Sequence, residues 1–153
     1  MDYEIVTLEE KTVAGLSVRT ANKEPDMMGK IGLVWQRLFN GGEGALIPDK
    51  KNDTVLGLYT NYQSDVNGSY DMIACYEVTE TAKLPPQFTF AVIPAGRYAK
   101  FIFHGDAEKD TGSFWNAVWN TPLERAYTGD FEEYPPSKDS HTSDIYIYIA
   151  VKG

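Results

Sequence analysis

The sequence predicts an α+β fold made of two tandem β-α-β-β units related by pseudo-twofold symmetry. Three observations lead to this prediction. The chain has 153 residues, a typical length for one domain with one core. Each half contains an amphipathic segment flanked by runs rich in β-branched and aromatic residues, and the order of these segments repeats after Pro85-Pro86. We therefore expect a single domain over residues 1–153, with repeat halves of about 1–84 and 85–153.

The first half begins with a strand region that leads into a helix. The run from Tyr3 to Arg19 is rich in β-forming residues and is interrupted by the charged segment LEEK, so that its VAGLSVRT part gives the stronger strand signal. A helix is predicted over Met27–Phe39, and Asn40-Gly41-Gly42 is a usual helix terminator. The apolar stripe of this helix has amphipathic spacing and consists of Ile31, Val34, Trp35 and Leu38.

Two strands complete the first half, and the second half repeats the order. VLGLYTNY and YDMIACYEV are predicted to pair as a hairpin around Asn67-Gly68. FTFAVIPAGRYAKFIFH is predicted as a strand pair or one long bent strand, with Pro94 at an edge or kink. Asp110–Arg125 is predicted as a helix limited by Pro122. DFEEYPP and DIYIYIAV then form two further strands separated by a polar loop.

Corresponding segments of the two halves are similar in pattern. VAGLSVRT matches PAGRYAKF, and the helix aromatics Trp35 and Phe39 match Trp115 and Trp119. Identity between the halves is low, so the alternative is that an α+β chain of this length is periodic by chance. A true duplication would relate the two helices by a twofold axis and leave a cavity between the halves, where pockets commonly form.

The charge balance argues against several classes of partner. The chain has 14 lysine and arginine residues against 22 aspartate and glutamate residues, a net charge of −8. Such a chain has no basic footprint for nucleic acid or an anionic membrane. No stretch approaches the ~18 apolar residues of a membrane span, and the start MDYEIVTLEE lacks the features of a signal peptide. We therefore expect a cytoplasmic protein that binds neither nucleic acid nor membrane directly.

Motifs for catalysis or cofactor binding are absent from the sequence. It contains no nucleophile elbow, no HExxH or CxxC pair, and no dinucleotide- or phosphate-binding loop, so we predict no cofactor and no metal site. The Gly-rich segment 41–44 follows a helix, which is the wrong end for binding an anion. Cys75 lies mid-strand and is expected to be a core thiol. His104 and His141 are expected to be ordinary surface or turn residues.

Carboxylates within predicted strands are the best candidates for chemistry. Strand alternation gives Glu77 a face shared with two apolar residues, so it either borders a pocket or lies at a solvated strand end. In DFEEY, Glu132 shares one face with Asp130 and Tyr134, whereas Glu133 takes the other, and a solvated Glu132 is again the alternative. A buried carboxylate among rings suits a cation with apolar surface, because ring faces add cation–π attraction of ~0.5–2 kcal/mol each.

An ordered set of segments spans nearly the whole chain. It comprises the helix IGLVWQRLF, the YxSDxNGxYD stretch Tyr62–Asp71, IPAGRYAKF, the helix FWNAVW, the strand DFEEY and the terminal strand IYIYIAV. In this order they resemble the GyrI-like small-molecule-binding domains, which also serve as effector-binding domains of AraC-type and MerR-type multidrug-responsive regulators. The resemblance implies two helices on a curved antiparallel sheet and a central aromatic groove for lipophilic, often cationic compounds, with a glutamate at its base.

The resemblance also assigns residues to the groove. The family's glutamate in the late strand corresponds to Glu132, followed by Tyr134, although the neighbouring Glu133 leaves the register open. Glu77 matches a less specific acidic position in the first half. Trp35 and Trp115 match the family's helix tryptophans that face the groove, and we expect its walls to be completed by Phe39, Tyr62, Trp119 and Tyr134.

The sequence thus predicts a stand-alone protein that captures lipophilic, cationic small molecules for sensing or sequestration. The first predicted strand begins almost at Met1, so we expect no DNA-binding domain ahead of it, and a role in transcription would require a partner regulator. The resemblance to GyrI-like domains implies one alternative, a hydrolase of reactive cyclopropanoid natural products, with Glu132 as general base if burial raises its pKa. The resemblance also implies a second alternative, a gyrase-interacting protein whose acidic surface mimics nucleic acid.

Overall fold

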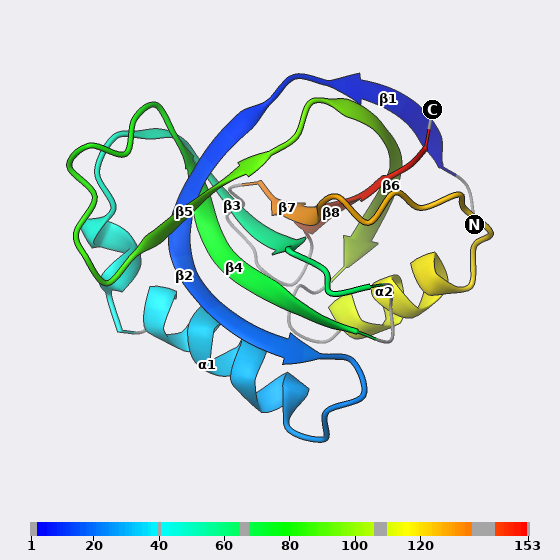
Figure 1. The fold of residues 1–153 in the computed structure, drawn as a ribbon, viewed down its shortest axis with the longest axis horizontal. Coiled ribbons are helices and arrows are strands. Elements are labelled where there is room, and N and C mark those ends of the chain that lie inside the picture. Colours follow the sequence, from blue (N-terminus) through cyan, green and yellow to red (C-terminus); the bar gives the residue numbers. More distant parts are fainter. Residues whose placement is uncertain (1–2, 40, 65–67, 106–109, 136–142, 153) are drawn as a thin grey trace.

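The described part of the chain contains strands, two α-helices and one short 3₁₀ helix, joined by loops (Figure 1). The computed structural model describes residues 3–39, 41–64, 68–105, 110–135 and 143–152. The helices are α1 (Met27–Phe39), α2 (Thr111–Trp119) and the short 3₁₀ helix η1 (Glu43–Leu46). The strands are β1 (Glu4–Leu8), β2 (Lys11–Ala21), β3 (Lys50–Thr60), β4 (Ser69–Val78), β5 (Thr89–Ile93), β6 (Gly96–Gly105), β7 (Asp130–Tyr134) and β8 (Ser143–Ala150).

These strands form one antiparallel sheet in the order β1-β6-β8-β7-β3-β4-β2-β5. The order reads the same from the opposite end when β1 to β4 exchange places with β5 to β8. The exchange relates the strands of the first half to those of the second, so the predicted α+β fold with pseudo-twofold symmetry is confirmed. The axis of this symmetry lies between the neighbouring strands β3 and β7.

Each half contains one strand more than the predicted β-α-β-β unit. β1 precedes β2 and pairs with β6, and β5 precedes β6 and pairs with β2. The register of Leu8 opposite Gly96 continues without a shift into that of Lys11 opposite Ile93, so the two halves share one long two-stranded ribbon. Pro94 interrupts this ribbon, as predicted, because proline has no backbone N–H to donate.

The sheet curls strongly, and both helices lie outside the curl (Figure 1). α1 packs onto β2 and β4 through the buried Val34 and Leu38. α2 packs onto β6 and β8 through the buried Val118. A separate cluster, which includes the fully buried Tyr98 and Phe131, fills the other face of the sheet. Because α1 covers β2 and β4 and α2 covers β6 and β8, the central strands β3 and β7 form the strip of sheet that runs between the two helices.

The second helix is shorter than predicted. It ends at Trp119 and does not continue to Arg125. Pro122 lacks an N–H and disfavours a helical conformation for the residue before it, which explains the early end. Arg125 instead forms a β-bridge with Val151, next to the end of β8.

The structure shows where the predicted hairpin, Cys75 and His104 lie. β3 and β4 pair antiparallel as predicted for the hairpin, although Asn67 of its turn lies outside the described residues, as do Asn40 and His141. Cys75 is fully buried, which raises the pKa of its thiol well above the usual range. His104 is exposed and pairs with an aspartate on the surface. Neither a reactive thiol nor a catalytic histidine is therefore indicated at these two positions.

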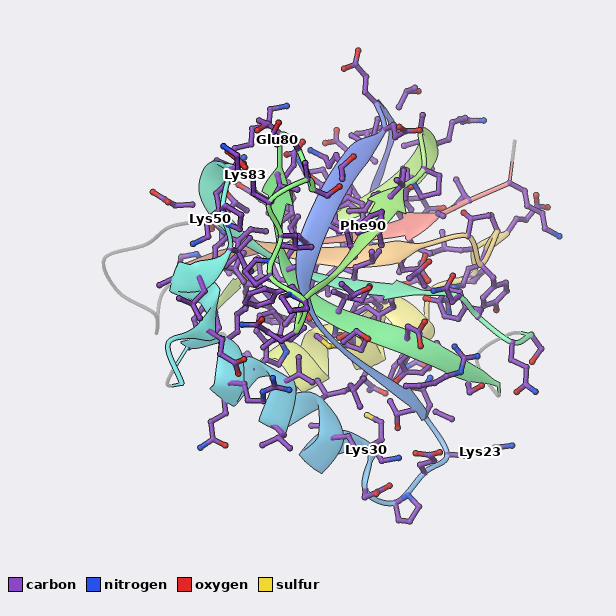
Figure 2. All side chains as sticks on the ribbon, turned by 60° about the vertical axis from the view of Figure 1, so that its left-hand side comes forward. Lys23, Lys30, Lys50, Glu80, Lys83 and Phe90 are labelled. Carbon is purple, nitrogen blue, oxygen red and sulfur yellow. The ribbon has the colours of Figure 1, made fainter. Side chains whose placement is uncertain are left out.

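Several charged side chains lie on the periphery of the molecule. Figure 2 shows Lys23, Lys30, Lys50, Glu80 and Lys83 around the outside of the ribbon. Within the described ranges, no helix combines the length and the apolar character that crossing a bilayer would need.

Candidate ligand-binding site

A buried carboxylate lies on the strip of sheet between the two helices. Glu132 of β7 is 1% exposed. One of its oxygens accepts a hydrogen bond from the Tyr59 hydroxyl at 3.1 Å, and the other accepts one from the indole N–H of Trp115 at 2.5 Å. The Tyr134 hydroxyl is a third donor. Among the residues that the structure describes, no lysine, arginine or histidine forms an ion pair with Glu132.

Burial governs the protonation of Glu132. The loss of water raises its pKa from 4.5 to about 7, although the hydrogen bonds from Trp115, Tyr59 and Tyr134 act in the opposite direction. The carboxyl group therefore changes its charge close to neutral pH. A cation placed against it would favour the ionised form, because opposite charges at short distance lower the pKa of a carboxyl group.

This pKa predicts how stability depends on pH. Because the pKa of Glu132 rises from 4.5 in a solvated state to about 7 in the fold, the unfolded chain binds fewer protons between these values. Stability is therefore lost as pH rises through this window, by about 1.4 kcal/mol per pH unit, and the loss is complete above it. Glutamine does not ionise in this range. We therefore expect the free energy of unfolding of Glu132→Gln, measured in urea, to rise relative to that of the wild type by roughly 2–3 kcal/mol from about pH 5 to about pH 8. Parallel profiles for the two proteins would contradict the raised pKa.

Aromatic residues surround Glu132 in two matching pairs. Trp115 of α2 meets Tyr59 of β3 edge to face at 5.2 Å between ring centres. Trp35 of α1 meets Tyr134 of β7 in the same manner at 5.7 Å. In each pair, the tryptophan of one half packs on a tyrosine of the other half, so the pairs follow the pseudo-twofold symmetry of the sheet.

A second ring on each helix extends these pairs towards solvent. Phe39 stacks on Trp35 at 5.7 Å and is 52% exposed. Trp119 lies 6.3 Å from Trp115 and is 49% exposed. Each helix thus contributes a row of rings that leads from the surface to the buried Glu132.

The pairing of β3 with β7 sets this arrangement. The ladder runs from Val55 opposite Tyr134 to Tyr59 opposite Asp130, and Gly57 opposite Glu132 is its middle pair. The symmetry axis passes through the middle of such an antiparallel pair, which makes Tyr59 and Tyr134 symmetry counterparts. Their hydroxyls approach the same carboxylate from either side of the axis.

A second buried carboxylate lies at the start of β7. Asp130 is 0% exposed and accepts hydrogen bonds from the Tyr62 hydroxyl at 2.5 Å, Arg125 at 2.7 Å and the backbone N–H of Ala150 at 2.9 Å. Unlike Glu132, this carboxylate has a guanidinium partner. Its role is therefore to join the segment after α2 to β8 and to Tyr62.

The structure places Glu77, the predicted second acid, on the opposite face of the sheet from Glu132. Glu77 shares the face of Ile73 and Cys75, which belong to the cluster on the other side of the sheet. It forms ion pairs with Lys11 at 3.6 Å and Lys51 at 3.4 Å. Strand alternation places the Glu77 carboxylate beside apolar residues. At this end of the strand, two lysines supply the opposite charge.

The remaining predicted residues lie at varying distances from Glu132. Its neighbour Glu133 points to the opposite face of the sheet and accepts a hydrogen bond from the Tyr148 hydroxyl, so that Glu132 alone of the two lies on the face that the helices cover. Tyr62 contacts Asp130 and reaches the site indirectly, through the ring of Tyr70 at 6.0 Å. The residues that sequence reasoning missed are Tyr59, Gly57, Tyr70, Asp130 and Arg125.

The pattern of this sequence matches one protein family along almost its whole length. The family of integron-associated effector binding proteins, Cass2, matches residues 4–151. The chain belongs to the Cass2 family. This assignment confirms the resemblance to GyrI-like effector-binding domains, and it makes the chain a small-molecule-binding domain related to transcription regulators.

Three similar proteins place this Cass2 member among known structures and sequences. An integron cassette protein, VCH_CASS2, from the mobile metagenome of Vibrio cholerae is 34% identical, with 98% of this chain and 95% of that chain covered and a TM-score of 0.80. YobU of Bacillus subtilis (strain 168), named as a candidate transcriptional regulator, is 30% identical over 97% of this chain and 96% of its own. SAV2435, solved with bound tetraphenylphosphonium, is 18% identical over 100% and 95%, with a TM-score of 0.82, and so shares the fold.

Proposed function

We propose that this Cass2-family protein binds lipophilic cations between its two helices, for sensing or sequestration, with Glu132 as the countercharge. The observation that supports this most strongly is the environment of Glu132. A carboxylate that is 1% exposed and bonded to aromatic donors has no cation of the described chain beside it. Burying an ionised carboxylate is unfavourable unless a positive charge accompanies it. A cationic guest would supply that charge.

The rings around Glu132 favour a guest that is apolar as well as positive. The rows formed by Trp35 with Phe39 and by Trp115 with Trp119 offer ring faces and apolar area on both sides. Each face that a cation covers adds ~0.5–2 kcal/mol, more when water is excluded. We place the guest against Glu132 and these rings, and we assign Tyr62 a supporting position behind them.

The fold of a relative is compatible with this guest. SAV2435, which shares the fold at a TM-score of 0.82, was solved with tetraphenylphosphonium bound. This compound combines one positive charge with four phenyl groups, so it is a suitable probe for the present chain. We expect it to quench tryptophan fluorescence and to bind more tightly than neutral triphenylphosphine oxide. Equal binding of the two compounds would contradict a carboxylate countercharge.

The affinity for the cation is expected to increase with pH. With the pKa of Glu132 raised to about 7, the carboxyl group is mostly protonated below that value and mostly ionised above it. Because apparent affinity scales with the fraction of the binding-competent form, tetraphenylphosphonium should bind roughly tenfold more tightly at about pH 8 than at about pH 6. Isothermal titration calorimetry measures this, and triphenylphosphine oxide is the neutral control. A pH-independent affinity would show that Glu132 does not meet the charge.

A second candidate function uses the same carboxylate as a base. A pKa of about 7 suits a general base at neutral pH, so Glu132 could take a proton from a water molecule that opens a strained cyclopropane ring. Incubation with a cyclopropanoid natural product would then give a product heavier by one water. Loss of that product in Glu132→Gln would support hydrolysis, and unchanged substrate with the wild type would leave binding as the function.

A regulatory role forms a further part of the proposal. YobU, which is similar over nearly its whole length, is named as a candidate transcriptional regulator. In the present chain we propose that a partner regulator reads the liganded state. Co-purification of a DNA-binding regulator that increases with tetraphenylphosphonium would support this, and a ligand-independent or absent partner would contradict it.

A further inference from the structure

Gly57 has no conformational reason to be glycine. It lies inside β3 with regular pairing on both sides, to Ala74 of β4 and to Glu132 of β7. It does not have the positive φ that Gly42 and Gly96 adopt. Glycine inside a strand weakens the strand and often marks a place where another group approaches closely. A glycine is therefore needed here because a neighbouring group occupies the position that a side chain would take.

The group that occupies this space is the side chain of Glu132. A Cβ atom at position 57 would lie 2.5 Å from a carboxylate oxygen of Glu132, 3.0 Å from its Cγ and 3.1 Å from its Cδ. The oxygen in question is Oε1, which accepts the hydrogen bond from Tyr59. The Glu132 side chain thus lies across Gly57, over the middle pair of the ladder.

We infer that Gly57 is the positioning residue for Glu132: its missing side chain lets one carboxylate lie across the symmetry axis, within reach of both tyrosines. Gly57 and Glu132 are counterparts in the two halves, because they form the middle pair of the ladder. Directly paired residues have Cβ atoms roughly 5 Å apart, so two glutamates here would repel each other. The two halves of the site therefore share a single charge at the symmetry axis.

Replacement of Gly57 by alanine tests this inference without any ligand. The new methyl group should displace the carboxylate from Tyr59 towards the space between the helices. Carbon-13 NMR of the glutamate carboxyl groups should then show the titration midpoint of Glu132 falling by more than about one pH unit towards its ordinary value. Gly29→Ala is the matched control, because a Cβ atom there meets nothing within 4 Å. A midpoint that is the same in Gly57→Ala and the wild type would overturn the inference.

A double-mutant cycle separates positioning from a general effect on the strand. In a Glu132→Ala background the obstructing atoms are gone, so Gly57→Ala should leave the unfolding temperature nearly unchanged, although it lowers that of the wild type. Equal losses in both backgrounds would overturn the inference. If Gly57→Ala alone fails to fold, folding of the double variant still supports the steric conflict, and failure of both contradicts it.

The consequence for binding rests on the proposed function. Displacement of the countercharge should weaken tetraphenylphosphonium binding by roughly tenfold or more in Gly57→Ala, and Gly29→Ala should bind as the wild type does. If the wild type does not bind the cation, the proposed function fails, but the titration and the cycle still decide the role of Gly57. If the wild type binds and Gly57→Ala binds equally well, the inference fails and the proposed function stands.

Discussion

Replacement of Glu132 by glutamine is expected to weaken tetraphenylphosphonium binding by roughly 10- to 100-fold, because a charge-assisted contact in a desolvated site contributes about 1.5–3 kcal/mol. Glutamine keeps the size of the side chain and an oxygen that can accept from Tyr59 or Trp115, so the rings should stay in place. The change therefore removes the charge and little else. Fluorescence titration at about pH 8, where the wild-type carboxyl group is ionised, gives the largest contrast.

Two controls make this result specific. Glu133→Gln removes the same charge from the adjacent residue, which lies on the other face of the sheet beside Tyr148, so it should change the affinity by less than about twofold. Binding of neutral triphenylphosphine oxide should be unaffected in Glu132→Gln. Equal affinity of the wild type and Glu132→Gln for the cation would remove Glu132 from the mechanism.

Strand alternation predicted part of this site for a physical reason. In an extended strand, successive side chains take opposite faces, so Glu132 and Glu133 had to separate and Tyr134 had to accompany Glu132. The choice of Glu132 came from the resemblance to GyrI-like domains, since alternation does not reveal which face the helices cover. The same limit explains Glu77, whose apolar companions lie on the face away from the helices.

The contacts that complete the site depend on strand register, which local sequence does not encode. Tyr59 and Gly57 reach Glu132 because β3 and β7 are neighbours, although these residues are more than 70 positions apart in the chain. A repeat of similar segments predicted two related halves, but it did not indicate that β1 and β5 would each pair with the other half. The glycine at position 57 gave a local signal, an unexplained break inside a strong strand, and its meaning appears only beside Glu132.

Arg125→Ala is expected to have the largest effect on stability, a loss of roughly 3–5 kcal/mol, because it leaves a buried charge without its partner. Asp130 is 0% exposed, and Arg125 Nη2 lies 2.7 Å from its carboxylate. The two remaining donors, Tyr62 and the Ala150 backbone, are neutral. For a chain of this size the loss corresponds to a fall of roughly 6–20 °C in the unfolding temperature, measured by calorimetry or circular dichroism.

The matched control is Arg37→Ala, which removes an arginine from an ion pair of the same 2.7 Å length in an exposed position. Exposed pairs contribute little, because water and salt screen both charges, so the unfolding temperature should change far less. Adding Asp130→Asn to Arg125→Ala should recover part of the loss, since a neutral amide oxygen can still accept from Tyr62 without a buried charge. If Arg125→Ala and Arg37→Ala unfolded at the same temperature, Asp130 would not be a buried charge that depends on Arg125. The comparison between Asp130, which has a cation partner, and Glu132, for which the described chain supplies none, would then no longer hold.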